Sequence, residues 1–135
     1  MRGIRRLLAV SLLALIGFAA ALVRFGQAAE QGCIAEPQPH PDYEVELVAP
    51  IEFTKTTYEL IVVRNGEPVT GARVCLDAAM GGMSAMSLSD EGEEVAPGRY
   101  ELYLPFQMPG PWEASVLVDE PGQDPVALPL SFRVD

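Results

Sequence analysis

The 135-residue sequence contains a single histidine, His40, and two cysteines, Cys33 and Cys75. His40 stands in Pro-Gln-Pro-His-Pro, so a Ser/His or Cys/His nucleophile pair would lack a firmly held base, and we expect a solvated linker residue. The sequence has no Walker or Rossmann glycine loop, and its two cysteines do not have the spacing of a zinc site. It therefore predicts a protein that is not an enzyme.

Basic residues are scarce beyond residue 29. All 19 acidic residues fall from Glu30 onward against five basic ones, so these 106 residues carry a formal net charge of −14. Nucleic acid and anionic membrane surfaces attract clustered Lys and Arg, and neither is expected as a partner. The simplest role of the acids is solubility, and the alternative is attraction of cations or of a basic partner.

The densest acidic run is Asp90-Glu91-Gly92-Glu93-Glu94. Its carboxylates lack the regular ligand spacing of a calcium-binding loop. We therefore expect this run to be a solvated turn.

The first 29 residues differ in kind from the rest. Three arginines precede an apolar run of 17 residues, 7–23, and small residues follow it. This is the layout of a secretory signal, with cleavage expected after Ala28. The alternative is a retained membrane anchor, because the run reaches about 25 Å and flanking arginines can extend to the headgroups. Either way the remainder is exported, to the periplasm or the outer face of the cytoplasmic membrane.

In an exported protein, Cys33 and Cys75 are most simply interpreted as a disulfide. If Ala72, Val74 and Leu76 point into the core, Cys75 points outward, where the proline-rich segment before the domain can lie against it. Free thiols, lipid attachment at Cys33 and metal ligation by Cys75 are the alternatives. Closing a loop of about 40 residues would contribute at most roughly 3 to 4 kcal/mol.

Segment 30–42 is polar and holds three prolines, so we expect an extended tether. From Tyr43 onward, apolar residues recur with period two between turns rich in Gly, Pro and Asn, which is typical of half-buried strands. The predicted strands cover residues 43–49, 56–63, 72–77, 83–88, 99–104, 111–118 and 126–134. Pro129 would place the last strand at a sheet edge. Residues 43–135 are therefore predicted to be all-β, a single immunoglobulin-like β-sandwich of about seven strands.

Four methionines follow Met1, and we call them the methionine cluster: Met80, Met83, Met86 and Met108. Thioethers are soft donors, and they are natural Cu(I) ligands in a compartment where thiols are lost to disulfides. Three of them stand in Ala-Met-Gly-Gly-Met-Ser-Ala-Met, where a flexible, glycine-containing loop would let the sulfur atoms converge. The alternative is that they pack at one end of the sandwich as adaptable apolar side chains.

Four segments in order carry a family resemblance: residues 66–74 (Gly-Glu-Pro-Val-Thr-Gly-Ala-Arg-Val), the methionine-rich residues 80–86, residues 98–101 (Gly-Arg-Tyr-Glu) and residues 108–113 (Met-Pro-Gly-Pro-Trp-Glu). Together they make the sequence similar to the YtkA-like and FixH-like group of small exported sandwiches. The resemblance implies an extracytoplasmic, often membrane-tethered domain, with some members linked to copper handling or to assembly of respiratory copper enzymes. Members often carry a histidine near the methionine segment, and none is present in residues 43–135 here, which leaves an all-thioether site.

The sequence thus predicts an extracytoplasmic, non-enzymatic accessory domain that binds Cu(I) through the methionine cluster. Its role would be copper handling or respiratory-enzyme assembly, with a membrane or periplasmic protein as partner. The alternative is a structural or protein-interaction module without metal, in which the methionines are packing or contact surface.

Overall fold

The computed structural model describes residues 33–135, apart from the side chain of Ser84. The predicted signal or anchor, residues 1–29, lies outside the described residues. Within the described part of the chain, no helix is long and apolar enough to cross a bilayer.

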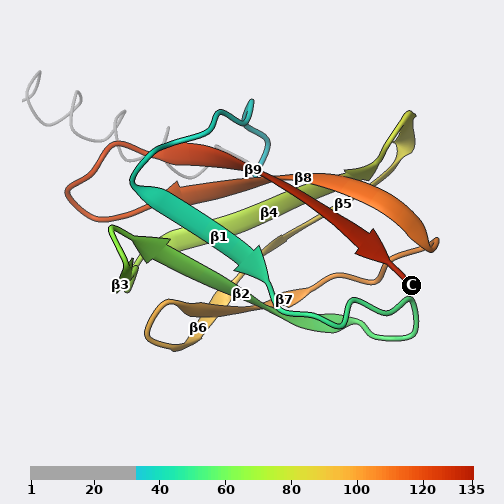
Figure 1. The fold of residues 1–135 in the computed structure, drawn as a ribbon, viewed down its shortest axis with the longest axis horizontal. Helices are drawn as coiled ribbons and strands as arrows, with labels where there is room; N and C mark the ends of the chain where they lie inside the picture. Colours follow the sequence, from blue (N-terminus) through green and yellow to red (C-terminus); the bar gives the residue numbers. More distant parts are fainter. Residues whose placement is uncertain (1–32) are drawn as a thin grey trace, which may run out of the picture. The chain divides into compact units, whose positions relative to one another are not determined.

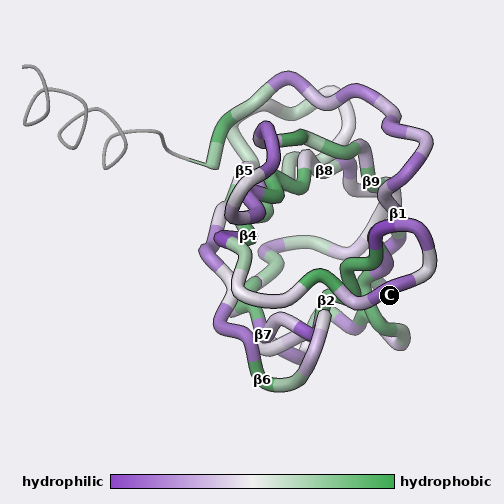
Figure 2. The backbone as a smooth tube through the Cα atoms, turned by 90° about the vertical axis from the view of Figure 1, so that its left-hand side faces the viewer, coloured by the Kyte–Doolittle hydropathy of each residue, from purple (hydrophilic) through white to green (hydrophobic). Residues whose placement is uncertain are grey.

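Residues 33–135 form nine strands in two antiparallel sheets (Figure 1). The strands are β1 (Tyr43–Leu47), β2 (Thr57–Arg64), β3 (Glu67–Pro68), β4 (Arg73–Met80), β5 (Met83–Glu91), β6 (Glu93–Ala96), β7 (Arg99–Tyr103), β8 (Gly110–Asp119) and β9 (Val126–Val134). Sheet A has the order β1-β2-β7-β6, with β3 paired to β2, and sheet B has the order β5-β4-β8-β9. Figure 2 shows β1 beside β9, where the edges of the two sheets approach each other.

The sheet orders confirm the predicted β-sandwich. In an immunoglobulin-like sandwich the strands A-B-E-D form one sheet, and C′-C-F-G form the other. Sheet A matches the first set in order, and sheet B matches the second. The chain passes from sheet B to sheet A at Gly92, whose N–H donates to the carbonyl of Val74 at 2.8 Å.

The core lies between the sheets and follows the alternation of the sequence. In β8, every second side chain from Trp112 to Val118 is buried. Phe106, in the connection before β8, packs edge to face against Trp112, with ring centroids 5.1 Å apart. The predicted inward face of this strand is confirmed, because period-two burial places one set of side chains between the layers.

Residues 33–42, which we call the strap, are extended and lie against sheet B. The hydroxyl of Ser115 donates to the carbonyl of Ala35 at 2.9 Å. Farther along, the N–H of Gln38 donates to the carbonyl of Ala127 at 2.9 Å. Ser115 points away from the core, and the strap buries it. This part of the sequence was expected to be a tether, and the structure shows it held at several points.

Cys33 and Cys75 form the expected disulfide, with their Cα atoms 5.3 Å apart. Val74 and Leu76 point into the core, so Cys75 lies on the outer face of β4, as predicted. It nevertheless has no exposed surface, because the start of the strap covers it. Disulfides of this kind are typical of proteins in oxidising compartments.

Two strands differ from the sequence-based expectation. β3 is only two residues long, and β6 lies in the acidic run that was expected to be a solvated turn. That expectation was wrong, because β5 continues to Glu91 and Glu93 begins β6, so the run carries the chain from one sheet to the other. The predicted edge position of Pro129 is confirmed, since β9 is the last strand of sheet B.

Candidate functional site

Three residues of the methionine cluster lie on one β-hairpin. Met80 ends β4, Gly81 and Gly82 form the turn, and Met83 begins β5. Met80 and Met83 are directly opposite each other in the ladder, so their side chains lie on the same face. The sequence predicted a flexible loop here, and the structure brings two of the methionines together by strand pairing instead.

Met86 lies three residues farther along β5. The register shifts between Ala79 and Met80: Ala79 pairs with Ser87, and Met80 pairs with Met83. Residues 84–86 are therefore extra on the β5 side and bulge from the ladder. Met86 and Met80 are both partly buried and pack against the core, whereas the Met83 side chain is 49% exposed.

Met108 reaches the same end of the sandwich from the connection between β7 and β8. Its carbonyl accepts a hydrogen bond from Nε1 of Trp112 at 3.1 Å. Trp112 in turn is the neighbour of Met80 across the β4–β8 ladder. The Met108 side chain is 38% exposed. Met80 and Met108 are thus both neighbours of the buried Trp112, and Met83 lies opposite Met80 one strand farther from it; the side chains of Met83 and Met108 are accessible to solvent.

Gly110 makes room for the Met80 side chain. Its φ of 134° lies in the region that favours glycine. A Cβ atom at this position would come within 2.6 Å of Cε of Met80, so the methionine methyl group lies almost against the glycine backbone. Any larger residue here would push Met80 away.

A shallow hollow of about 390 Å³ opens at the hairpin turn. It is lined by Ala79, Met80, Gly81, Gly82, Met83 and Glu113. Glu113 is exposed and pairs with Ala79 from β8, on the face of sheet B opposite to that of Met80 and its partner Trp112.

The other candidate ligands lie elsewhere. Both cysteines of the chain are in the disulfide, which removes the free-thiol and metal-ligand alternatives for Cys75 in this structure. His40 lies in the strap, where its ring packs edge to face on Tyr43 and its Nδ1 accepts the N–H of Asp42. In residues 33–135, His, Cys, Asp and Glu side chains form no group of three or more that could hold a metal ion.

Two side chains with shifted pKa values, Tyr100 and Glu120, make hydrogen bonds that support the fold. Burial raises the pKa of Tyr100 to about 12, and its hydroxyl donates to the carbonyl of Val69 at 2.8 Å. Glu120 accepts two hydrogen bonds from Arg64, which lower the pKa of its carboxyl group. Both groups join neighbouring elements of the sandwich.

Sequence reasoning singled out the four methionines but missed two residues that organise them, Gly110 and Trp112. A signal was present, because Met-Pro-Gly-Pro-Trp combines a turn sequence with the single tryptophan of the chain. What the sequence could not give was the β4–β8 register that places Trp112 opposite Met80.

Neither a curated protein nor a solved structure matches the chain. The model of the YtkA-like family matches residues 38–117, which run from the strap nearly to the end of β8 and make up more than half of the sequence. The protein therefore belongs to the YtkA-like family.

Proposed function

We propose that this YtkA-like domain is an exported, non-enzymatic accessory domain that binds Cu(I) through the methionine cluster. The observation that carries the proposal is the directly opposed pair Met80 and Met83 at the hairpin turn, with Met108 tied to the neighbouring Trp112. A disulfide-bonded protein has no thiolate to offer, so thioethers are its soft donors. The bound ion would be cargo for a membrane or periplasmic protein of copper handling or respiratory-enzyme assembly.

The arrangement suits transient binding. Met83 and Met108 are accessible to a partner, while Met80 and Met86 are partly buried against the core. Uncharged thioethers hold Cu(I) without proton release, so affinity should depend little on pH near neutrality. Exchange with a partner would begin at the exposed methionines.

The test is competition for Cu(I) against a chromophoric chelator of known affinity, using the full-length chain in a non-ionic detergent. The matched variant changes Met80, Met83, Met86 and Met108 to Leu, which removes sulfur and preserves apolar volume. Wild type should withdraw Cu(I) from the chelator, and the variant should bind at least about tenfold more weakly. If both compete equally poorly, the copper proposal is wrong.

A second titration guards against an artefact of the reductant. Reductants that maintain Cu(I) can open the Cys33–Cys75 disulfide, and the freed thiolates would themselves bind copper. Ag(I), a soft monovalent ion that needs no reductant, should therefore give the same difference between wild type and the four-Leu variant. Intact mass before and after each titration reports the state of the disulfide.

The alternative function is a protein-interaction module without metal. The observation that favours it is the packing of Met80 and Met86 against the core, which gives these side chains a structural role. In that case the four-Leu variant should retain both its stability and its crosslinked partners, in copper-replete and copper-starved cells alike. Partner recovery that depends on copper and on the sulfur atoms would instead support the copper proposal.

A further inference from the structure

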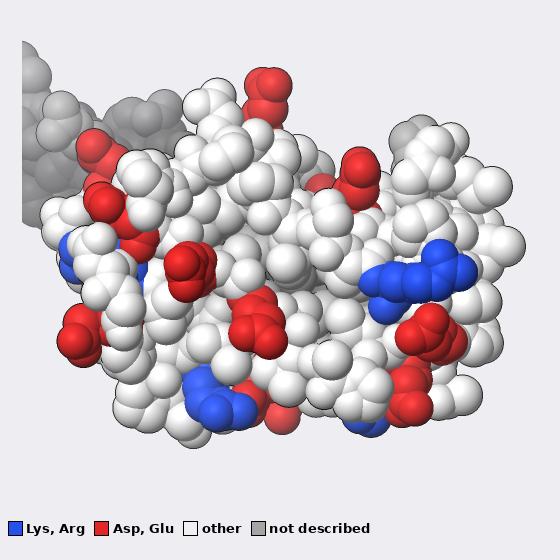
Figure 3. All heavy atoms as spheres, in the orientation of Figure 1, with Lys and Arg blue, Asp and Glu red and all other residues white. Residues whose placement is uncertain are grey.

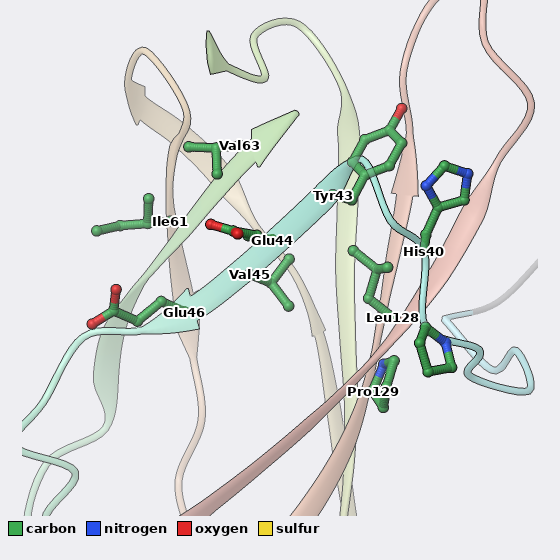
Figure 4. Close-up of a pocket in the computed structure, with 10 residues that line it drawn as sticks. His40, Tyr43, Glu44, Val45, Glu46, Ile61, Val63, Leu128 and Pro129 are labelled. Atoms are coloured by element: carbon green, nitrogen blue, oxygen red, sulfur yellow. The ribbon is translucent and has the colours of Figure 1, made fainter. Parts of the chain in front are cut away.

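A groove of about 540 Å³ runs along β1 at the open edge of the sandwich (Figure 4). We call it the edge groove, and it is lined by Pro39, His40, Tyr43, Glu44, Val45, Glu46, Ile61, Val63, Leu128 and Pro129. In Figure 4, Val45 lies on the same side of β1 as Leu128 and Pro129 of β9. Glu44 and Glu46 lie on the other side, with Ile61 and Val63 of β2. The groove therefore offers both apolar and acidic groups around a single strand.

The backbone of β1 has an unpaired edge in this groove. The N–H of Val48 donates to the carbonyl of Glu59. In the register of β1 and β2 these two residues are opposite each other, so they form a hydrogen-bonded pair of the antiparallel ladder. By alternation, Glu44 and Glu46 also direct their N–H and C=O groups to β2, whereas Val45 directs its own away from it. β1 is the end strand of sheet A, so the backbone groups of Val45 face the groove.

β9, the edge strand that faces β1, is protected against pairing with a further strand, and β1 is not protected in the same way. At the start of β9, Gln38 of the strap donates to the carbonyl of Ala127, and beyond its end the N–H of Asp135 donates to Ile51. Between them, Pro129 has no N–H to offer. These are familiar means of preventing edge-to-edge pairing. The middle of β1 carries only its two glutamates.

Those glutamates disfavour one occupant, a second copy of this chain. If two β1 strands paired antiparallel with Val45 opposite Val45, each Glu44 would lie opposite the other copy's Glu46. Like charges directly opposite each other destabilise a strand pair. A partner strand with Lys or Arg at these positions would instead be attracted, because the groove lining contains no Lys or Arg. The neighbouring Arg64 is held by Glu120, with Nε and Oε2 3.0 Å apart.

We propose that the edge groove binds an extended segment of a partner protein with alternating basic and apolar side chains, which adds to β1 as a further strand. Main-chain hydrogen bonds to Val45 would supply affinity, as in other cases of strand addition. The apolar side chains would lie with Val45 and Leu128, and the basic ones beside Glu44 and Glu46. This recognition is independent of the methionine cluster.

The test is fluorescence anisotropy with a short dye-labelled peptide of alternating Lys and Val, titrated with the full-length chain in a non-ionic detergent. The peptide should bind, and its counterpart with Glu in place of Lys should not. Glu44→Gln with Glu46→Gln should weaken binding about tenfold. The matched control, Glu93→Gln with Glu101→Gln on β6 and β7, removes the same charge elsewhere and should change affinity less than about twofold.

Peptides methylated on alternate backbone amides test strand addition itself. One set carries methyl groups on the Val amides and the other on the Lys amides, so in a paired strand only one set points at β1. One methylated peptide should lose binding and the other should keep it. Equal loss in both, equal retention in both, or equal binding of the Glu and Lys peptides would overturn the proposal.

Discussion

Cys75 is fully buried on the outer face of sheet B, and its bond to Cys33 fixes the first described residue of the chain to the middle of that sheet. β4 pairs with β5 on one side and β8 on the other, so the disulfide reaches the best-supported part of the sheet. The strap then continues over Ser115 to the edge of β9. The strap is therefore held to the outer face of sheet B by one covalent bond and by hydrogen bonds.

Removing the disulfide should destabilise the domain. For Cys33→Ala with Cys75→Ala, we expect the free energy of unfolding to fall by about 3 kcal/mol, because the unfolded chain is no longer restricted by the cross-link. Equilibrium urea unfolding measures the change. Ser115→Ala, which removes one strap hydrogen bond, should cost about 1 kcal/mol and serves as the control. A double alanine variant no less stable than Ser115→Ala would contradict this prediction.

Gly110→Ala should destabilise the protein through Met80. An alanine at φ 134° is strained, and its Cβ would displace the Met80 methyl group. The control is Gly122→Ala, because Gly122 also has a positive φ, of 80°, but has open space around it. We expect Gly110→Ala to cost about 1 kcal/mol more than the control in urea unfolding. That difference should shrink in a Met80→Ala background, since the colliding group is then absent.

Much of the fold could be predicted because the strands obey period two. β9 was predicted with the bounds that it has, and the buried face of β8 from Trp112 onward follows the alternation. β6 was not predicted, because Glu-Glu-Val-Ala has no alternation of apolar and polar residues and the strand is held by its pairing with β7. Local pattern cannot reveal a strand whose support comes entirely from a distant neighbour.

The sequence predicted which residues make up the candidate site, but it did not predict how they are arranged. The methionine sequence indicated which side chains to consider, but the convergence of Met80 and Met83 depends on a hairpin with a bulge. The edge groove gave no sequence signal at all, because Glu44 and Glu46 resemble any solvated face of a strand. It arises only when β1 and β9, which are far apart in the chain, approach each other.

The fluorescence of Trp112 should report metal binding. It is the single tryptophan of the chain, it is buried, and it contacts Met108 while lying opposite Met80. Under the proposed function, Ag(I) should quench or shift its emission with the stoichiometry of one bound ion. Met108→Leu should weaken the response, whereas Glu101→Gln on the far sheet should leave it unchanged. An identical titration curve for Met108→Leu would argue against Met108 as a ligand.

Glu120 should make stability depend on acidic pH. Its carboxylate accepts hydrogen bonds from Nε and Nη2 of Arg64, at 3.0 and 3.2 Å, and from the hydroxyl of Tyr43, at 2.9 Å. The Arg64 hydrogen bonds, assisted by that from Tyr43, lower the pKa of Glu120 below its ordinary value. A group whose pKa is lower in the folded state stabilises the fold above its unfolded pKa, about 4.3 for Glu. That contribution is lost as the pH falls through the lower, folded pKa.

Glu120→Gln should therefore be less stable than wild type at neutral pH, and the difference should diminish as the pH falls from about 5 toward 2. Urea unfolding of both proteins across this range measures it, and comparing the two cancels the titration of the other carboxyl groups. Tyr43→Phe, which removes one donor but keeps Arg64 in place, should show a smaller effect with the same pH dependence. A difference between wild type and Glu120→Gln that is constant with pH would mean that the carboxylate acts through packing and not through its charge.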